Sequence, residues 1–266
     1  PPGVDPFARD NPIVFASAPL VGTGLTTTAK YAVVTKSPLT GFIADSLSSS
    51  YFALELKKLG SDALVITGRA AKPVYLFLRN ESVEFRDAGA FWGMSPMQTE
   101  ASIKKDLRDK DVRIASIGLA GENRVRFATL SNEGRHAGRG GVGAVFGSKN
   151  LKAIAIRGSR HASVADPKQL EQIGMELRKA SLGPQTAKYR EIGTVANLSV
   201  FNRLGSLPVH NFQKGSFPSV ERLSGETLRE EHGNRAQGCA SCTIRCERQY
   251  RTREGAHQRL EYETLF

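Results

Sequence analysis

The sequence predicts an α+β protein: a sheet-rich first domain, residues 1–160, followed by the start of a helical domain, residues 161–266. Two observations predict this class. Short runs of β-branched and aromatic residues, bounded by Gly, Pro and Asn, recur from residue 12 to residue 156, whereas helical spacing prevails after Gly158. The chain has 266 residues, of which 40% are hydrophobic and 24% charged, which suits a globular protein of one large domain or two ordinary ones.

Strands dominate the predicted first domain. Apolar residues at Phe52, Leu56 and Leu59 predict a helix over residues 50–59 that ends at Gly60, and a second helix is expected over 97–107. Residues 83–86 alternate in polarity, and we expect them to pair with 74–78 across a turn at Asn80. The remaining strands are expected within 12–22 and over 31–35, 63–67, 113–118, 125–130 and 151–156.

Helices are expected in the second domain. Asp166 followed by Pro167 is a typical helix start, because proline is tolerated at the first helical position. Helical patterns cover residues 167–181 and about 186–204, and a short one covers 226–231. Between them, residues 205–222 are rich in Gly, Ser, Pro and Phe and are expected to form a loop.

The charge balance favours anionic partners. Lys and Arg number 37 against 26 Asp and Glu, a formal net charge of +11 that is spread over both halves of the chain. An even spread differs from the one-sided basic surface of a DNA-binding domain. No apolar run approaches the roughly 20 residues that a membrane span needs, and no export signal precedes the first strand. The sequence thus argues against an integral membrane protein.

The three cysteines lie within eight residues, as Cys239, Cys242 and Cys246, in the order Cys-x2-Cys-x3-Cys. Three clustered thiolates with a more remote fourth suit a four-iron, four-sulfur cluster. Zinc ribbons prefer two separated Cys-x2-Cys pairs, although His232 or His257 could supply another ligand. The spacing favours iron and sulfur over zinc or over three unrelated core cysteines, without excluding either.

Six arginines accompany the cysteines. A run of arginines commonly forms a solvated face, but around an anionic cluster it would offset charge and tune the reduction potential. The six are Arg235, Arg245, Arg248, Arg251, Arg253 and Arg259.

A glycine-rich segment covers residues 136–147 and holds five glycines in twelve residues. It departs from the dinucleotide-binding spacing and lacks the Gly-Lys-Ser/Thr order of a P-loop, and a single Arg-Gly-Gly is no RNA-binding tract. Two interpretations stay open. Consecutive backbone N–H groups could bind a phosphorylated group, or the glycines could form a purely structural turn.

These segments together resemble the tungsten-dependent aldehyde:ferredoxin oxidoreductase family. The similarity runs through essentially the whole chain but covers less than half of a family member. It is carried by residues 33–42, 115–123, 137–154, 238–246 and 261–263. The chain starts without Met and ends directly after a charged segment, so we expect it to be part of a longer protein that is inactive as this fragment alone.

The resemblance implies a tungsten (or molybdenum) bis-pyranopterin whose phosphates are bridged by magnesium, lying on a first-domain platform, and one [4Fe-4S] cluster beside it. By that resemblance Cys239, Cys242 and Cys246 are cluster ligands, and the fourth cysteine lies outside this chain. The residues against the pterin would be Lys30, Ser49, His136, Ala137 and Gly138.

The family pattern is not matched everywhere. Lys30 stands where members often have an Arg, so it would meet phosphate as a point charge without a bidentate fork. Leu47 to Ser50 stand where members usually have an Asn and a Gly-Gly pair, and Leu47 cannot donate a hydrogen bond as Asn can.

The reaction implied is oxidation of aldehydes to carboxylic acids, with electrons leaving through the cluster to ferredoxin. Glu261 and Glu263 fall at the segment that supplies the family's active-site carboxylate, and we favour Glu263 as the general base. The family's partner His lies outside this chain. Two alternatives are kept: the same cofactors used to reduce an aromatic thioester or carboxylic acid, or a zinc-stabilised basic nucleic-acid-binding protein.

The expected partners are an aldehyde, ferredoxin or a similar acceptor, and either further copies of the chain or electron-transfer subunits. Neither nucleic acid nor a membrane is expected as a partner. An oxygen-sensitive cluster and the lack of an export signal imply an anaerobic cytoplasm.

Overall fold

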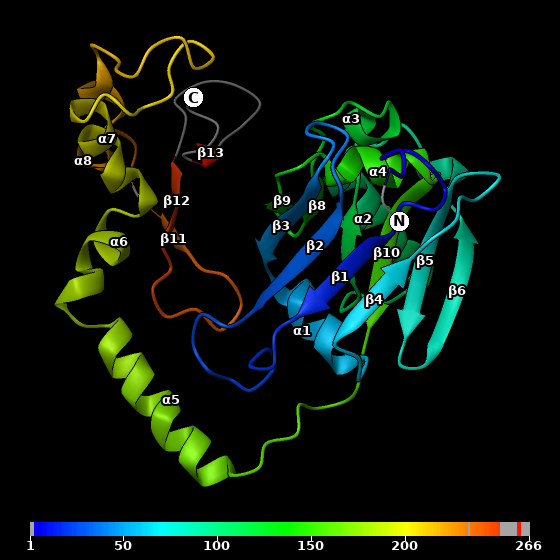
Figure 1. Ribbon diagram of the computed structural model, residues 1–266. Coiled ribbons are helices and arrows are strands. Elements are labelled where there is room, and N and C mark those ends of the chain that lie inside the picture. Colours follow the sequence, from blue (N-terminus) through cyan, green and yellow to red (C-terminus); the bar gives the residue numbers. More distant parts are fainter. Residues whose placement is uncertain (1–2, 234, 251–259, 262–266) are drawn as a thin grey trace. The chain divides into compact units, whose positions relative to one another are not determined.

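The computed structural model describes residues 3–233, 235–250 and 260–261. Contacts between residues divide the chain into two compact units, Pro1–Pro167 and Lys168–Phe266. The first unit carries two sheets and their covering helices, and the second is mainly helical (Figure 1). This architecture confirms the predicted α+β class.

A four-stranded antiparallel sheet lies at the start of the first unit, in the order β3-β2-β1-β4. One of its faces is buried, with Ile13, Phe15, Tyr31 and Val33 at 1% exposure or less. Alternation of buried and exposed residues along each strand produces this one-sided burial. The strands are β1 (Ile13–Ser17), β2 (Lys30–Lys36), β3 (Ile43–Ser49) and β4 (Ala63–Ile66).

A six-stranded sheet follows, in the order β6-β5-β10-β7-β8-β9. Its central strand, β10, runs parallel to β5 and antiparallel to β7, and it is buried along nearly its whole length. The predicted pairing across Asn80 is confirmed, because β5 and β6 form an antiparallel hairpin there. The strands are β5 (Val74–Arg79), β6 (Ser82–Asp87), β7 (Arg113–Ser116), β8 (Leu130–Asn132), β9 (Arg135–Ala137) and β10 (Leu151–Arg157).

The helices of the first unit begin and end where local chemistry requires. Ser50 caps α1 by accepting a hydrogen bond from the Phe52 N–H, and Gly60 follows its end. Ser95 and Gln98 form a capping box at the start of α2. The helical elements are α1 (Tyr51–Lys58), η1 (Gly89–Phe91), α2 (Pro96–Leu107), α3 (Leu119–Glu122) and α4 (Val142–Ser148).

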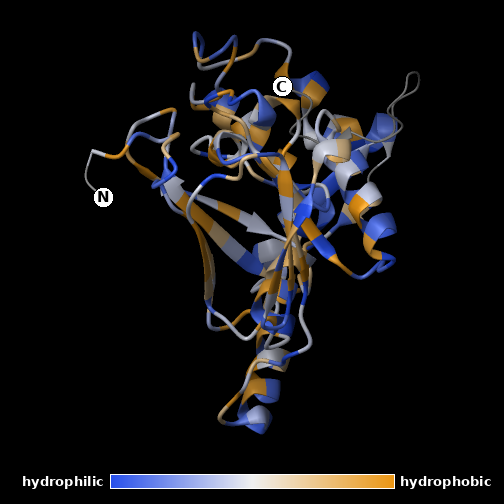
Figure 2. Ribbon diagram, turned by 90° about the vertical axis from the view of Figure 1, so that its right-hand side faces the viewer, coloured by the Kyte–Doolittle hydropathy of each residue, from blue (hydrophilic) through white to orange (hydrophobic). Residues whose placement is uncertain are grey.

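The second unit is built from short helices and a three-stranded sheet. Figure 2 shows alternating hydrophobic and hydrophilic residues along α5, the long helix at the bottom of the view. The helical elements are α5 (Pro167–Ser181), η2 (Pro184–Thr186), α6 (Ala187–Glu191), η3 (Thr194–Asn197), α7 (Leu198–Arg203), η4 (Val220–Leu223) and α8 (Gly225–His232). The sheet, in the order β11-β12-β13, comprises β11 (Arg235–Gln237), β12 (Glu247–Tyr250) and β13 (Leu260–Glu261).

Two predicted elements are wrong. Residues 125–129 form turns instead of a strand, since the Val125 N–H bonds to the Ala120 carbonyl and the Ala128 N–H to the Val125 carbonyl. The single helix predicted over about 186–204 is broken at Gly193, whose φ of 93° no helix accommodates.

Several structured segments were not predicted, among them the β11-β12-β13 sheet of the second unit and helix α3. Strand β3 is rich in Ser and Asp, which have low β-propensity, and its seven-residue pairing with β2 overrides that preference. The segment expected as a glycine-rich loop holds both β9 and α4.

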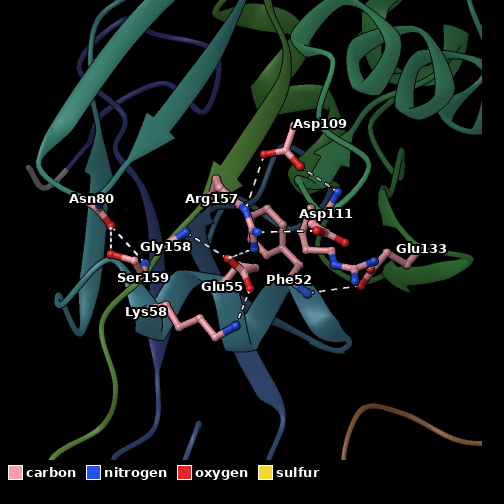
Figure 3. Close-up of polar contacts among 11 residues, drawn as sticks. Phe52, Glu55, Lys58, Asn80, Asp109, Asp111, Glu133, Arg157, Gly158 and Ser159 are labelled. Carbon is pink, nitrogen blue, oxygen red and sulfur yellow. Dashed lines mark hydrogen bonds and ion pairs between the residues drawn. The ribbon is translucent and has the colours of Figure 1, made fainter.

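A buried carboxylate fixes the end of the first unit. Glu55 accepts hydrogen bonds from the Gly158 N–H at 2.9 Å and from Lys58 Nζ at 2.7 Å. Arg157 lies 3.8 Å from Glu55 and also pairs with Asp109 at 3.4 Å (Figure 3). The contacts of Glu55 attach the end of β10 to α1, and the pair with Asp109 links β10 to the residues that follow α2.

Candidate functional site

The proposed pterin-contacting residues gather where the two sheets of the first unit meet. Strand β3, the edge of the first sheet, packs against β9, the edge of the second, and we call this junction the β3–β9 seam. Lys30 and Ser49 are direct cross-strand neighbours on β2 and β3. His136 and Ala137 lie on β9, and Gly138 follows it. Ser49 thus lies on the β3 side of the seam and the 136–138 segment on its β9 side, whereas Lys30 lies on β2, one strand away from the seam.

A buried amide holds the seam together. Asn132, 1% exposed, donates from Nδ2 to the Tyr31 hydroxyl at 2.8 Å and to Ser48 Oγ at 3.1 Å. Ser48 Oγ in turn donates to Asn132 Oδ1 at 2.9 Å. Burial raises the pKa of the Tyr31 hydroxyl, so this group stays protonated and neutral. Asn132 therefore joins β2 and β3 to β8 across the two sheets.

A second bond crosses the same seam, from the Arg139 N–H to Ser46 Oγ at 2.9 Å. Sequence reasoning missed both Asn132 and Ser46. The available signal was the alternation along β3, in which Ser46 and Ser48 are buried on either side of the exposed Leu47.

Three neighbours at the seam differ in exposure. His136 is exposed, and its Nδ1 lies 2.9 Å from Ser131 Oγ. Ala137 is fully buried in the core and Gly138 is exposed. Of the three, His136 and Gly138 are therefore accessible to a bound group, whereas the side chain of Ala137 is not.

Most glycines of the 136–147 segment serve close packing. A Cβ on Gly141 would lie 1.9 Å from the carbonyl oxygen of Arg126. A Cβ on Gly147 would lie 1.9 Å from the carbonyl oxygen of Gly121. Gly140 and Gly143 are also closely packed, against Ala44 and Thr129. At Gly138, in contrast, a Cβ would meet only the Thr129 methyl group, at 3.9 Å. Packing thus explains four of the five glycines, and Gly138 is left available for close approach of a ligand.

Backbone donors near the start of α4 are already engaged. The Gly143 N–H bonds to the Ala128 carbonyl, and the Ala144 N–H bonds to the Gly141 carbonyl, both at 3.0 Å. These bonds favour the structural interpretation of the segment over a phosphate cradle at this point.

The outer face of the four-stranded sheet is exposed and largely apolar. Residues directly opposite each other in an antiparallel pair project to the same face, so Lys30, Ser49 and Leu47 share it. Leu47 is 57% exposed, and Val65 on β4 is 59% exposed. This face offers an apolar surface that also carries two ammonium groups, Lys30 and Lys36 at opposite ends of β2, and the exposed carboxylate of Asp45 on β3.

The three cysteines lie on the loop that connects β11 and β12 in the second unit. All three are free thiols, partly exposed, and the Cys242 N–H bonds to the Cys239 carbonyl at 3.1 Å. Cys246 is fixed from another element, because its carbonyl accepts a hydrogen bond from the Thr194 N–H. Within the described residues, no three His, Cys, Asp or Glu side chains converge as a site for a metal ion. Free thiols on one loop nonetheless fit the donor chemistry of an iron–sulfur cluster.

Both predicted active-site carboxylates are at the margin of the structure. Glu261 ends β13, where its backbone pairs with Gln249, but its side chain lies outside the described part. Glu263 lies outside the described residues altogether.

Family models match nearly all of the chain. The model for the aldehyde ferredoxin oxidoreductase N-terminal domain matches residues 1–158, and the model for domains 2 and 3 of the same proteins matches residues 172–266. The chain belongs to the aldehyde ferredoxin oxidoreductase family. Membership confirms the resemblance seen in the sequence and the assignment to an oxidoreductase family, and it decides against the nucleic-acid-binding alternative.

Curated members of the aldehyde ferredoxin oxidoreductase family align with the whole chain. The tungsten-containing aldehyde ferredoxin oxidoreductases of Pyrococcus abyssi and Pyrococcus horikoshii are 46% and 44% identical to it. In each, the alignment covers all of this chain and 44% of the relative, so the chain spans less than half the length of these proteins. A more distant relative, the WOR-like subunit of an aliphatic sulfonate oxidoreductase from Pyrococcus furiosus, is 37% identical over 79% of this chain and 36% of its own.

A solved structure has the same fold. The active-site complex BamBC of benzoyl coenzyme A reductase, with bound 1,5-dienoyl-CoA, matches with a TM-score of 0.80 and 28% identity. The match covers 98% of this chain and 42% of the other. No helix in the described part of this chain has the length and apolar character needed to span a membrane.

Proposed function

We propose that this chain carries the tungstopterin platform, residues 1–160, and three cluster ligands, within residues 161–266, of an enzyme that oxidises aldehydes to carboxylic acids. The observation that carries the proposal is the alignment of the whole chain with tungsten-containing aldehyde ferredoxin oxidoreductases. When bound, the tungsten (or molybdenum) pterin supplies two-electron chemistry and the cluster supplies one-electron transfer to ferredoxin.

The first unit fits a flat, anionic cofactor. The exposed face around Leu47 and Val65 offers apolar surface for the pterin rings, and Lys30 on that face supplies a positive charge for the phosphates and their magnesium ion. Ser49, opposite Lys30, adds a hydroxyl as a hydrogen-bond partner. On the other side of the seam, His136, Ala137 and Gly138 would complete the contact, with Gly138 allowing close approach.

The second unit supplies thiolates. Cys239, Cys242 and Cys246 would each bind one iron of a [4Fe-4S] cluster, and the fourth ligand would come from outside this chain. Among the carboxylates, Glu263 would act as general base on water or substrate, with Glu261 as the second candidate. General-base catalysis is most efficient when the pKa of the base lies near the working pH.

A second candidate reaction is the reduction of an aromatic thioester or carboxylic acid with the same cofactors. One observation favours it: the structural match to benzoyl coenzyme A reductase at a TM-score of 0.80.

Anaerobically purified complete protein separates the two reactions. Ferredoxin reduction is followed in the visible spectrum after addition of aliphatic and aromatic aldehydes. We expect aldehyde-dependent reduction, and protein purified from tungsten- and molybdenum-depleted cells serves as the control. Inactivity toward every aldehyde, combined with consumption of an aromatic thioester under reduced ferredoxin, would replace the first candidate with the second.

A further inference from the structure

Arg248, on β12, is a guanidinium buried inside the second unit. It is 2% exposed, and it is the largest of the fully buried side chains among the described residues. Of the six arginines around the cysteines, Arg235 and Arg245 are exposed, and Arg251, Arg253 and Arg259 lie outside the described residues. Arg248 is thus the arginine that the structure singles out.

The hydrogen bonds of Arg248 reach only main-chain carbonyls. Its Nη1 donates to the Arg245 carbonyl at 3.1 Å and its Nη2 to the Arg190 carbonyl, while Nε has no hydrogen-bond partner in the described part of the chain. No carboxylate of the described residues forms an ion pair with it. Burying a full positive charge is costly unless an opposite charge compensates it. Among the described residues, Arg248 is therefore a buried guanidinium without a paired carboxylate.

Arg248 is also fixed next to a proposed cluster ligand. Gly193 packs against both Arg248 and Cys246, because a Cβ there would lie 2.6 Å from Arg248 Cγ and 2.7 Å from the Cys246 carbonyl oxygen. The Thr194 N–H holds the same Cys246 carbonyl at 3.1 Å. These contacts tie the Arg248 stem and the Cys246 backbone to one short segment, so the two residues keep a fixed relation.

We propose that Arg248 compensates the negative charge of the cluster bound by Cys239, Cys242 and Cys246 and thereby sets its reduction potential, an inference that rests on the proposed function. A [4Fe-4S] core with four thiolates is anionic and gains one further negative charge when it takes up an electron. A buried cation nearby stabilises the reduced form more than the oxidised form, because Coulomb interactions are strong where water is excluded. Arg248 therefore raises the potential.

The test is a redox titration of the cluster in the complete protein, followed by electron paramagnetic resonance, with iron content measured in parallel. Arg248→Gln removes the buried charge. At the midpoint potential of the wild-type cluster, we expect the ratio of reduced to oxidised cluster to be at least tenfold lower in this variant. For one electron, a tenfold change corresponds to a midpoint potential that is lower by about 59 mV. Arg245→Gln is the matched control: it removes an exposed charge next to Cys246, and solvent screening limits its effect to less than about threefold.

An iron-loaded Arg248→Gln protein with the same midpoint as Arg245→Gln would overturn the inference and leave the proposed function intact. If Arg248→Gln loses its iron, the Arg248→Lys variant is measured instead, because it keeps the positive charge. Retention of iron, with a ratio of reduced to oxidised cluster within about threefold of wild type, supports a charge role. Loss of iron in that variant as well would overturn it in favour of packing. Wild-type protein without iron would refute the cluster itself.

Discussion

Gly141 illustrates how a single residue fixes the first unit. Its φ of 69° and the 1.9 Å approach of a would-be Cβ to the Arg126 carbonyl leave room only for glycine. We expect Gly141→Ala to lower the free energy of unfolding by more than about 3 kcal/mol, since strain and backbone displacement add. Gly134→Ala is the control, because Gly134 has a similar φ of 75° with nothing within 4 Å of its Cβ position. If chemical denaturation showed the same loss of unfolding free energy for both variants, the positive φ alone would account for it, and the close contact with Arg126 would not contribute.

Lys152 and Glu122 form a buried ion pair in the first unit, and their side chains are 0% and 3% exposed. Lys152 also donates to the Met94 carbonyl at 2.9 Å, and Glu122 accepts from the Gly93 N–H. We expect Lys152→Met to lower the free energy of unfolding by about 3–5 kcal/mol, because it leaves a buried carboxylate uncompensated.

Two comparisons check that reason. Adding Glu122→Gln to Lys152→Met removes the unpaired charge, so the double variant is expected to recover part of the loss. Lys104→Met breaks the more exposed pair with Glu100 and is expected to cost less than about 1 kcal/mol. A double variant less stable than the single one would contradict this account.

At the scale of elements, the β3–β9 seam joins the two sheets that carry the proposed pterin contacts. Asn132→Ala would leave buried hydroxyls of Tyr31 and Ser48 without their partner, at a cost of about 1–3 kcal/mol, and would loosen β3 from β8 and β9. We therefore expect the tungsten content per chain to fall while the iron content stays unchanged. Asn202→Ala, which removes a hydrogen bond to the Phe217 N–H in the second unit, should leave tungsten unchanged. Equal tungsten in both variants would contradict the role of the seam.

The sequence predicts those elements whose local pattern and packing agree. Helix α1 has its apolar spacing, its cap at Ser50 and its stop at Gly60, and α5 covers the predicted residues 167–181. Strand β3 could not be predicted, because Asp45, Ser46 and Ser48 form a strand only through pairing with β2 and burial at the seam. The same holds for Asn132, whose partners lie more than 80 residues away in the chain.

For the whole molecule, the residues proposed to bind the cofactors fall into two groups, one in each unit, and the sequence pattern locates the two groups unequally. The three cysteines are evident from spacing alone, whereas the choice of Arg248 among six arginines requires burial, which no local pattern encodes. We expect Cys242→Ala to abolish the broad visible absorbance of the cluster in the complete protein, because a cubane with a missing ligand is lost or degraded. A spectrum unchanged from wild type would reject Cys242 as a ligand.

The central claim is that the chain forms the cofactor-binding portion of a tungsten and iron–sulfur enzyme. Elemental analysis of the complete, anaerobically purified protein tests it most directly. The account predicts tungsten, or molybdenum in its place, together with about four iron atoms per chain. Zinc in the absence of tungsten, molybdenum and iron would contradict it.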